Sequence, residues 1–144
     1  MKKVIILSVL SFISLGAFVP NDFKDQIIEK LETYSETDYP EKAYVQTDKS
    51  YYLMDDTIWF TGYLVNGISH KKSSKSRVLH VELINELDSI VDHKRLYIDE
   101  ISEAGDIEIS QKWNPGKYLL RAYTNDMRNN SEEYFFKKDI WIWS

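Results

Sequence analysis

The chain has 144 residues, a mass of 17.0 kDa and 43% hydrophobic residues, enough for one ordinary domain with a single buried core. Its formal net charge of -5, without a basic stripe, argues against nucleic-acid binding. It contains no cysteine, which excludes disulfides, a thiol nucleophile and a lipid anchor attached through cysteine.

The first 17 residues have the pattern of a secretory signal peptide. Lys2 and Lys3 precede an apolar run, and the small residues Gly16 and Ala17 follow it. The run of about 14 residues is shorter than the ~20 that span a bilayer, so we expect cleavage rather than retention as a membrane anchor. The mature protein would then be exported, without a stable membrane span and not as a lipoprotein.

Residues 18–42 predict a short amphipathic helix and a linker. The apolar residues of Asn21 to Ser35 recur at near-helical spacing, and Asn21 or Asp22 is placed to cap the first turn. Such a short helix is marginal alone, so we expect its apolar stripe to pack on this domain or on a neighbour. Pro40 disfavours helix at the residue before it. We therefore divide the chain into a signal peptide (1–17), a helix and linker (18–42) and a β-domain (43–144).

From residue 43 onward, short strand-like runs alternate with turn residues, as in a β-sandwich. The runs cover 43–46, 51–53, 57–65, 76–85, 90–98, 104–109, 117–124 and 134–143. Alternation assigns these residues to the core: Ile58, Phe60, Leu64, Leu79, Val81, Leu83, Ile107, Ile109, Tyr118, Leu120, Ala122, Phe136, Ile140 and Ile142. Val91 falls on the face opposite Leu96 and Ile98 unless a bulge intervenes. Tyr118, which follows Gly116, suits a tyrosine corner.

Catalytic chemistry is sparse in this sequence. No Gly-x-Ser-x-Gly elbow occurs, and the three histidines lack metal-ligand spacing. His80 and Glu82 share an outward strand face, where they could form a weak metal site or be two solvated side chains; the second interpretation is favoured. Asp55 and Asp56 suit a tight turn, in which carboxylates accept hydrogen bonds from backbone amides. We predict neither an enzyme nor a cofactor or metal site.

Aromatic residues outside the core are the candidates for function. Trp59 and Tyr63 lie on the face opposite Ile58, and Trp141 and Trp143 lie on the outer face of the last strand. Exposed aromatic residues often mark contact surfaces, because they bury much area with little loss of entropy. The alternative is that the N-terminal helix or loops cover them. We predict that a protein partner or a neighbouring domain buries at least one pair.

The stretch from Tyr44 to Val65 resembles the second macroglobulin-type domain of the α-macroglobulin family. The family pattern, a Thr-Asp-Lys-x-x-Tyr turn and then an apolar strand, matches these residues: Tyr44, Thr47-Asp48-Lys49, Tyr51 or Tyr52, Asp56-Thr57 and Ile58 to Phe60. The similarity extends through Gly116-Lys117-Tyr118, and Ala122 to Asn129 is similar to bacterial versions in large exported surface proteins. Ser50 stands where Pro is usual, and Asp55 where Gly is usual; Asp tolerates left-handed backbone, so we expect the turn to survive.

The resemblance implies a seven-stranded antiparallel β-sandwich of fibronectin or immunoglobulin type. In full-length members it also implies endopeptidase inhibition by trapping. Trapping needs a bait segment and several further domains, and thioester-bearing members need a cysteine that this chain lacks. The chain ends at Ser144, directly after the last strand, so we expect one module, either part of a larger product or a small stand-alone relative.

Our first hypothesis is a non-catalytic interaction or scaffold module in the periplasm or at the cell surface of a bacterium. The second is a component of a protease-trapping inhibitor. The third is carbohydrate binding through Trp59, Tyr63 or Trp141.

Overall fold

A computed structural model describes residues 21–144. The chain separates into two compact units, Met1–Asp38 and Tyr39–Ser144. The predicted signal peptide, residues 1–17, lies outside the described residues. Within the described part, no helix combines the length and the apolar content that a membrane crossing requires.

The described residues of the first unit are helical. The helix predicted from its apolar spacing is α2 (Asn21–Thr33), and it continues as a π-helical turn, η1 (Tyr34–Asp38). The Thr37 hydroxyl donates to the Thr33 carbonyl at 2.7 Å, a local bond from side chain to backbone within the helical segment. The apolar side chains of this unit are exposed; they are Phe23, Ile27, Ile28, Leu31 and Tyr34.

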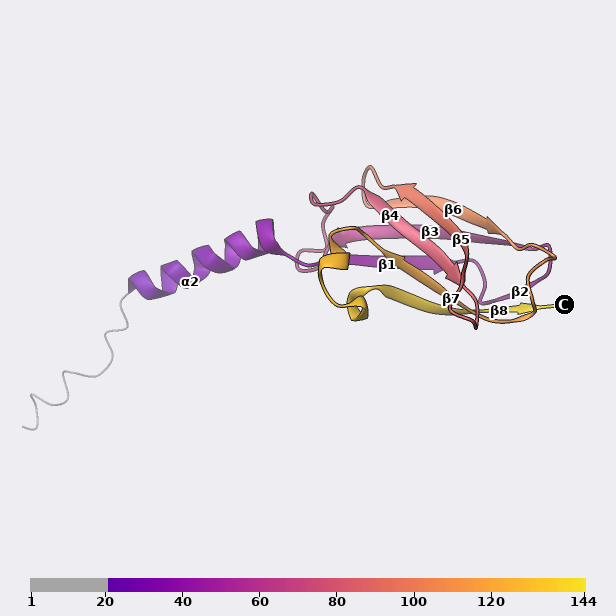
Figure 1. Cartoon of the computed structure of the whole chain (residues 1–144). Coiled ribbons are helices and arrows are strands. Elements are labelled where there is room, and N and C mark those ends of the chain that lie inside the picture. Colours follow the sequence, from indigo (N-terminus) through magenta and orange to yellow (C-terminus); the bar gives the residue numbers. More distant parts are fainter. Residues whose placement is uncertain (1–20) are drawn as a thin grey trace, which may run out of the picture. The chain divides into compact units, whose positions relative to one another are not determined.

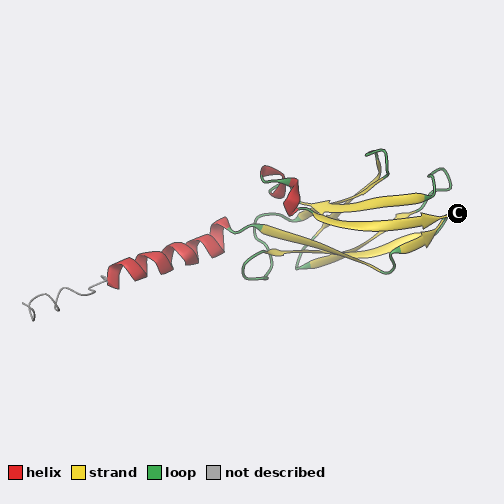
Figure 2. Cartoon of the chain, turned by 90° about the horizontal axis from the view of Figure 1, so that it is seen from below, coloured by secondary structure: helices red, strands yellow, loops and turns green. Residues whose placement is uncertain are grey.

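The second unit is a two-layer β-sandwich (Figures 1 and 2). Its strands are β1 (Glu41–Thr47), β2 (Tyr51–Leu53), β3 (Thr57–Asn66), β4 (Val78–Ile84), β5 (Ile90–Tyr97), β6 (Ser102–Glu108), β7 (Gly116–Tyr123) and β8 (Phe136–Trp143). Two short 3-10 helices, η2 (Met127–Asn129) and η3 (Glu132–Tyr134), lie between β7 and β8. One sheet has the order β1-β3-β6 and the other β2-β8-β7-β4-β5.

The expectation of seven antiparallel strands is wrong, because the described residues form eight strands and β2 runs parallel to β8. After β1 the chain turns and crosses from the three-stranded sheet to the edge of the five-stranded sheet. The turn is held by Asp48, whose Oδ1 accepts from the Tyr52 hydroxyl at 2.6 Å and from the Trp59 amide at 3.2 Å. This short strand was visible in the sequence as the run 51–53.

The core lies between the two sheets and confirms the predicted alternation. All the assigned core residues are buried except Phe136, which is half-buried and packs against the same cluster. Val91 is the extra residue of a β-bulge: Leu83 pairs with Asp92, and the next residue, Ile84, pairs with Ile90. The bulge allows Val91 and Leu96 to pack on one core although their spacing places them on opposite faces. Tyr118 forms the predicted tyrosine corner, its hydroxyl donating to the Asn114 carbonyl at 2.7 Å.

The turn before β3 has the left-handed residue that the sequence predicts. Asp55 has φ 66°, and Asp56 Oδ2 accepts from the Leu53 amide and from Lys49 Nζ, both at 3.1 Å. We expect Asp55→Gly to raise the free energy of unfolding by about 0.5 kcal/mol, because glycine adopts this conformation without a Cβ clash. Asp55→Val should lower it by about 1 kcal/mol. Urea unfolding measures the two free energies. An equal loss of stability in Asp55→Gly and Asp55→Val would contradict the claim that the left-handed backbone at residue 55 limits stability.

Candidate interaction surfaces

Trp141 and Trp143 form part of an exposed apolar patch on the outer face of the five-stranded sheet. Tyr51 lies beside Trp141, and Leu53 beside Trp143, in the parallel pairing of β2 with β8. The four side chains are 64%, 57%, 37% and 55% exposed in the order Tyr51, Leu53, Trp141, Trp143. We call these four residues the β2–β8 patch.

The backbone beneath the β2–β8 patch is well anchored. The Trp141 amide donates to the Ser50 carbonyl, and the Met54 amide to the Trp143 carbonyl, each at 3.0 Å. The two indole rings lie 6.4 Å apart at 21° to each other. Ile140 and Ile142, which alternate with the tryptophans, are buried in the core. The patch is therefore an exposed apolar surface on two strands that are hydrogen-bonded to each other.

Trp59 and Tyr63 lie on the other sheet, so the structure does not bring the four predicted residues together. Both point outward from β3, where Trp59 is 60% exposed and Tyr63 is half-buried. Tyr63 packs against Tyr44 of β1, with ring centroids 6.1 Å apart. A shallow groove of about 390 Å³ runs between Trp59 and Tyr63.

Sequence reasoning missed Tyr51 and Leu53 as surface residues. It recognised their run as a strand but could not place that strand next to β8. The pairing joins residues about 90 positions apart, as in Tyr51 with Trp141. Alternation within a strand reports which face a side chain occupies but carries no information on the neighbouring strand.

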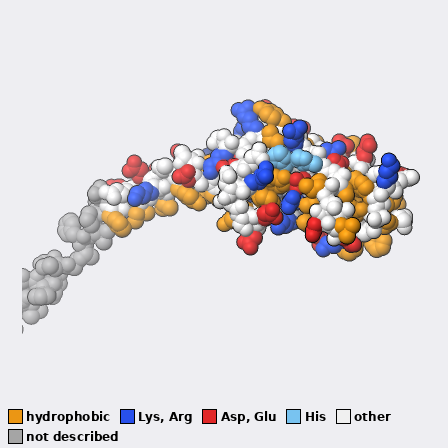
Figure 3. All heavy atoms as spheres, in the orientation of Figure 1, with side chains coloured by type: hydrophobic (Ala, Val, Ile, Leu, Met, Phe, Trp, Pro, Cys, Tyr) orange, Lys and Arg blue, Asp and Glu red, His pale blue; other side chains and the backbone are white. Residues whose placement is uncertain are grey.

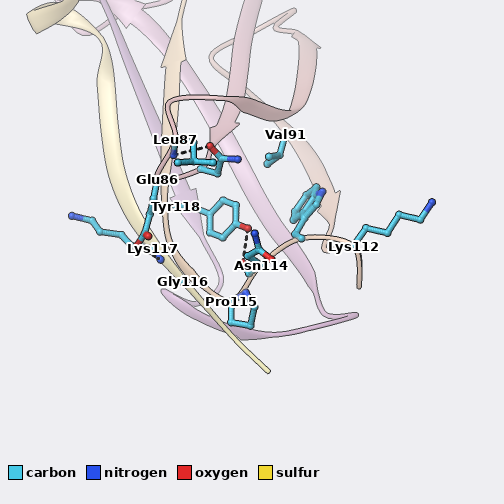
Figure 4. A pocket seen from close by; sticks show the side chains of 11 residues that line it. Glu86, Leu87, Val91, Lys112, Asn114, Pro115, Gly116, Lys117 and Tyr118 are labelled. Carbon is cyan, nitrogen blue, oxygen red and sulfur yellow. Dashed lines mark hydrogen bonds between the residues drawn. The ribbon is translucent and has the colours of Figure 1, made fainter.

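A pocket of about 430 Å³ opens at one end of the sandwich, between the β4–β5 turn and the loop before β7 (Figure 4). Its apolar walls include Leu87, Val91 and Tyr118, and Trp113 lies 6.0 Å from the Tyr118 ring. Burial raises the pKa of the Tyr118 hydroxyl, as does the charge of Glu86. The residues that line the pocket include no histidine, serine or cysteine.

The prediction of a solvated Glu82 is wrong. Glu82 is 4% exposed, although it points away from the main core. Its Oε2 accepts from Arg121 Nε at 3.0 Å and Nη2 at 2.7 Å, and its Oε1 accepts from the Tyr123 hydroxyl at 2.7 Å. Burial alone would raise the pKa of Glu82, but the hydrogen bonds from Tyr123 and Arg121 outweigh it and hold the pKa below its usual value.

His80 is also tied into this network rather than solvated. Its Nδ1 lies 3.1 Å from His93 Nε2, and its ring stacks on Tyr123 at 5.2 Å. Burial lowers the pKa of His80, and the neighbouring His93 lowers it further. Histidine side chains are visible over β4 and β5 in Figure 3. Among the described residues, no three His, Cys, Asp or Glu side chains are grouped to hold a metal ion.

Several solved structures contain a domain with a similar arrangement of strands. The native conformation of E. coli alpha-2-macroglobulin matches 75% of this chain with a TM-score of 0.58 and 13% identity. Salmonella alpha-2-macroglobulin reacted with methylamine matches 76% with the same TM-score and identity. Trypsin-activated E. coli alpha-2-macroglobulin matches 72%, with a TM-score of 0.58 and 12% identity. The domain has a macroglobulin-like fold.

The macroglobulin-like domain is small beside these proteins, of which it covers only 6% to 7%. No family model and no curated protein sequence matches the chain. The resemblance inferred from Tyr44 to Val65 is confirmed at the level of the fold.

Proposed function

We propose that this macroglobulin-like domain is a non-catalytic interaction or scaffold module that works outside the cytoplasm. It holds a neighbouring domain or a protein partner through the β2–β8 patch. The exposure of four large apolar side chains on two paired strands is the observation that carries this proposal. Contiguous apolar surface of this kind is typical of protein contacts, where aromatic side chains contribute most of the binding energy.

The fold comparison supports a neighbouring domain as the partner. The matched macroglobulins are far longer than this domain, so the same fold there occupies a small part of a large chain. The patch also suits a partner that binds without rearrangement, because its backbone hydrogen bonds are already made. An export pattern at residues 1–17 and the absence of cysteine are consistent with a site outside the cytoplasm.

We expect the double variant Trp141→Ala, Trp143→Ala to bind its partner at least about tenfold more weakly, because two central aromatic anchors are removed. Quantitative crosslinking in the native cell envelope measures the complex, and sedimentation velocity of the purified domain tests a second copy as the partner. Trp59→Ala, on the opposite sheet, is the matched control. Equal crosslinking and equal heat stability in all variants would contradict the proposal.

Similarity to alpha-2-macroglobulins favours one second candidate, a component of a protease-trapping inhibitor. In that case the domain contributes structure to a trap that is built with other segments or chains. Incubation with trypsin, elastase and subtilisin tests it: protection of a large protein substrate would support the inhibitor, and unchanged proteolysis with no stable complex would exclude it.

A further inference from the structure

The groove on the outer face of the three-stranded sheet has a chemistry different from that of the β2–β8 patch. We call it the β3 groove. In the strand register, Gln46, Thr61 and Ala104 form one row across β1, β3 and β6. Trp59 lies on β3 two residues before Thr61, and Tyr63 lies two residues after it, so the two aromatic residues are on opposite sides of this row. The groove of about 390 Å³ thus has small or polar residues on its floor and an aromatic ring at each end.

The backbone of Trp59 and the ring of Tyr63 are held by neighbouring residues. The Trp59 amide donates to Asp48 Oδ1 at 3.2 Å, and the Trp59 carbonyl accepts from the Asp48 amide at 3.0 Å. Tyr63 packs on Tyr44, which in turn makes an edge-to-face contact with Phe136 at 5.2 Å. Tyr63 lies four positions after Trp59 along the extended strand, a distance of about 13 Å between their Cα atoms. A ligand would therefore meet two aromatic side chains at a spacing set by the strand.

The floor offers hydrogen-bonding groups that carry no charge. Within the described residues, neither the Gln46 amide nor the Thr61 hydroxyl makes a side-chain hydrogen bond, so both are free for a ligand. No lysine or arginine is among the residues that line the groove. Its carboxylate, Asp48, already accepts from Tyr52 and Trp59. This lining disfavours phosphates and other anions, which need cationic or clustered amide donors.

We propose that the β3 groove binds a neutral oligosaccharide segment of two or three sugar rings. Aromatic faces at both ends pack against the C–H faces of sugar rings, while the Gln46 amide and the Thr61 hydroxyl bond their hydroxyl groups. The groove volume lies within the range of small-ligand sites. A fully apolar partner would leave the floor groups unpaired, which costs binding energy. This activity goes beyond the proposed scaffold role and uses the opposite sheet.

The test titrates the purified mature chain with neutral oligosaccharides: cellohexaose, xylohexaose, mannohexaose, maltohexaose and chitohexaose. Isothermal calorimetry should show saturable binding of at least one of them. Trp59→Ala and Tyr63→Ala should each weaken it about tenfold, through loss of a stacking surface. Gln46→Ala, at an exposed position, should weaken it severalfold without affecting the fold.

Trp143→Ala is the matched control, because it removes an exposed indole from the other sheet. It should bind sugar like the parent chain, and all variants should keep the parent melting temperature. Absence of saturable binding across the panel at millimolar concentrations would overturn the proposal. So would sugar binding that survives both Trp59→Ala and Gln46→Ala. The two tests are independent: if the β2–β8 patch fails to crosslink a partner, the outcome of the sugar titration still stands.

Discussion

Replacing Glu82 by alanine is expected to lower the free energy of unfolding by about 3 kcal/mol. The substitution removes the carboxylate that pairs with Arg121 and accepts from the buried Tyr123 hydroxyl. Arg121 is only 21% exposed and would keep a salt-bridge contact to Glu132 at 3.6 Å, which is mostly solvated. The guanidinium would thus lose its main partner in a poorly hydrated position. Urea unfolding of the purified chain measures the effect.

Two controls separate the charge from the packing. Glu82→Gln keeps the size of the side chain and one hydrogen-bond acceptor, so we expect it to lower the free energy of unfolding by only about 1–2 kcal/mol. Glu108→Ala removes an exposed glutamate from β6 and should change stability by less than about 0.5 kcal/mol. A loss for Glu82→Ala as small as that for Glu108→Ala would contradict the role of the pair.

The pH dependence gives an independent check of the same carboxylate. The pKa of Glu82 is lowered by folding, so its stabilisation is present above the unfolded pKa of about 4.3. It is lost as the pH falls through the lower, folded pKa. The parent chain should therefore lose more stability than Glu82→Gln between about pH 5 and pH 2. Parallel curves would be evidence against a lowered pKa at Glu82.

The second large effect is expected at Glu41, which begins β1 and is 5% exposed. Its carboxylate accepts from the Ser76 amide at 3.0 Å, the Ser76 hydroxyl at 2.7 Å and the Thr124 hydroxyl at 2.6 Å, and also from the Ser73 hydroxyl. We expect Glu41→Ala to lower the free energy of unfolding by about 3 kcal/mol, because several buried donors lose their shared acceptor. Urea unfolding gives the total.

Hydrogen exchange shows which part of the chain is destabilised. The loop amides at 73–76 should exchange faster in Glu41→Ala than in the parent. Glu41→Gln retains one of the two acceptor oxygens, so it should lower the free energy of unfolding by only about 1 kcal/mol. Lys42→Ala, at the exposed neighbouring position of β1, is the matched control. Unchanged protection of residues 73–76 would show that Glu41 does not hold this loop.

Several features of the fold follow from short stretches of sequence. The tight turn at Asp55 and Asp56 follows from the local residues, and its left-handed position from the Gly that is usual there in the family that the stretch resembles. The turn before Tyr118 predicts the tyrosine corner. Such features depend on residues a few positions apart, where backbone preference and side-chain reach act directly. The bulge at Val91 was recognisable as an inconsistency in the alternation, although its position required the strand pairing.

The buried carboxylates could not be found in this way. Glu82 reaches Arg121 across 39 positions of sequence, and Glu41 reaches Thr124 across 83. A glutamate in an alternating strand has the same local signal whether solvent or a distant loop covers it. Both were therefore missed, and the outward position of Glu82 was mistaken for exposure.

The sequence by itself determined the approximate positions of the strands, the inward face of most of them and the outward direction of the four aromatic candidates. Only the tertiary structure decided how those four are grouped. It placed Trp59 and Tyr63 over a polar floor on one sheet, and Trp141 and Trp143 beside Tyr51 and Leu53 on the other. The reason is that side-chain alternation is a local property of extended backbone, whereas the choice of neighbouring strands depends on long-range pairing.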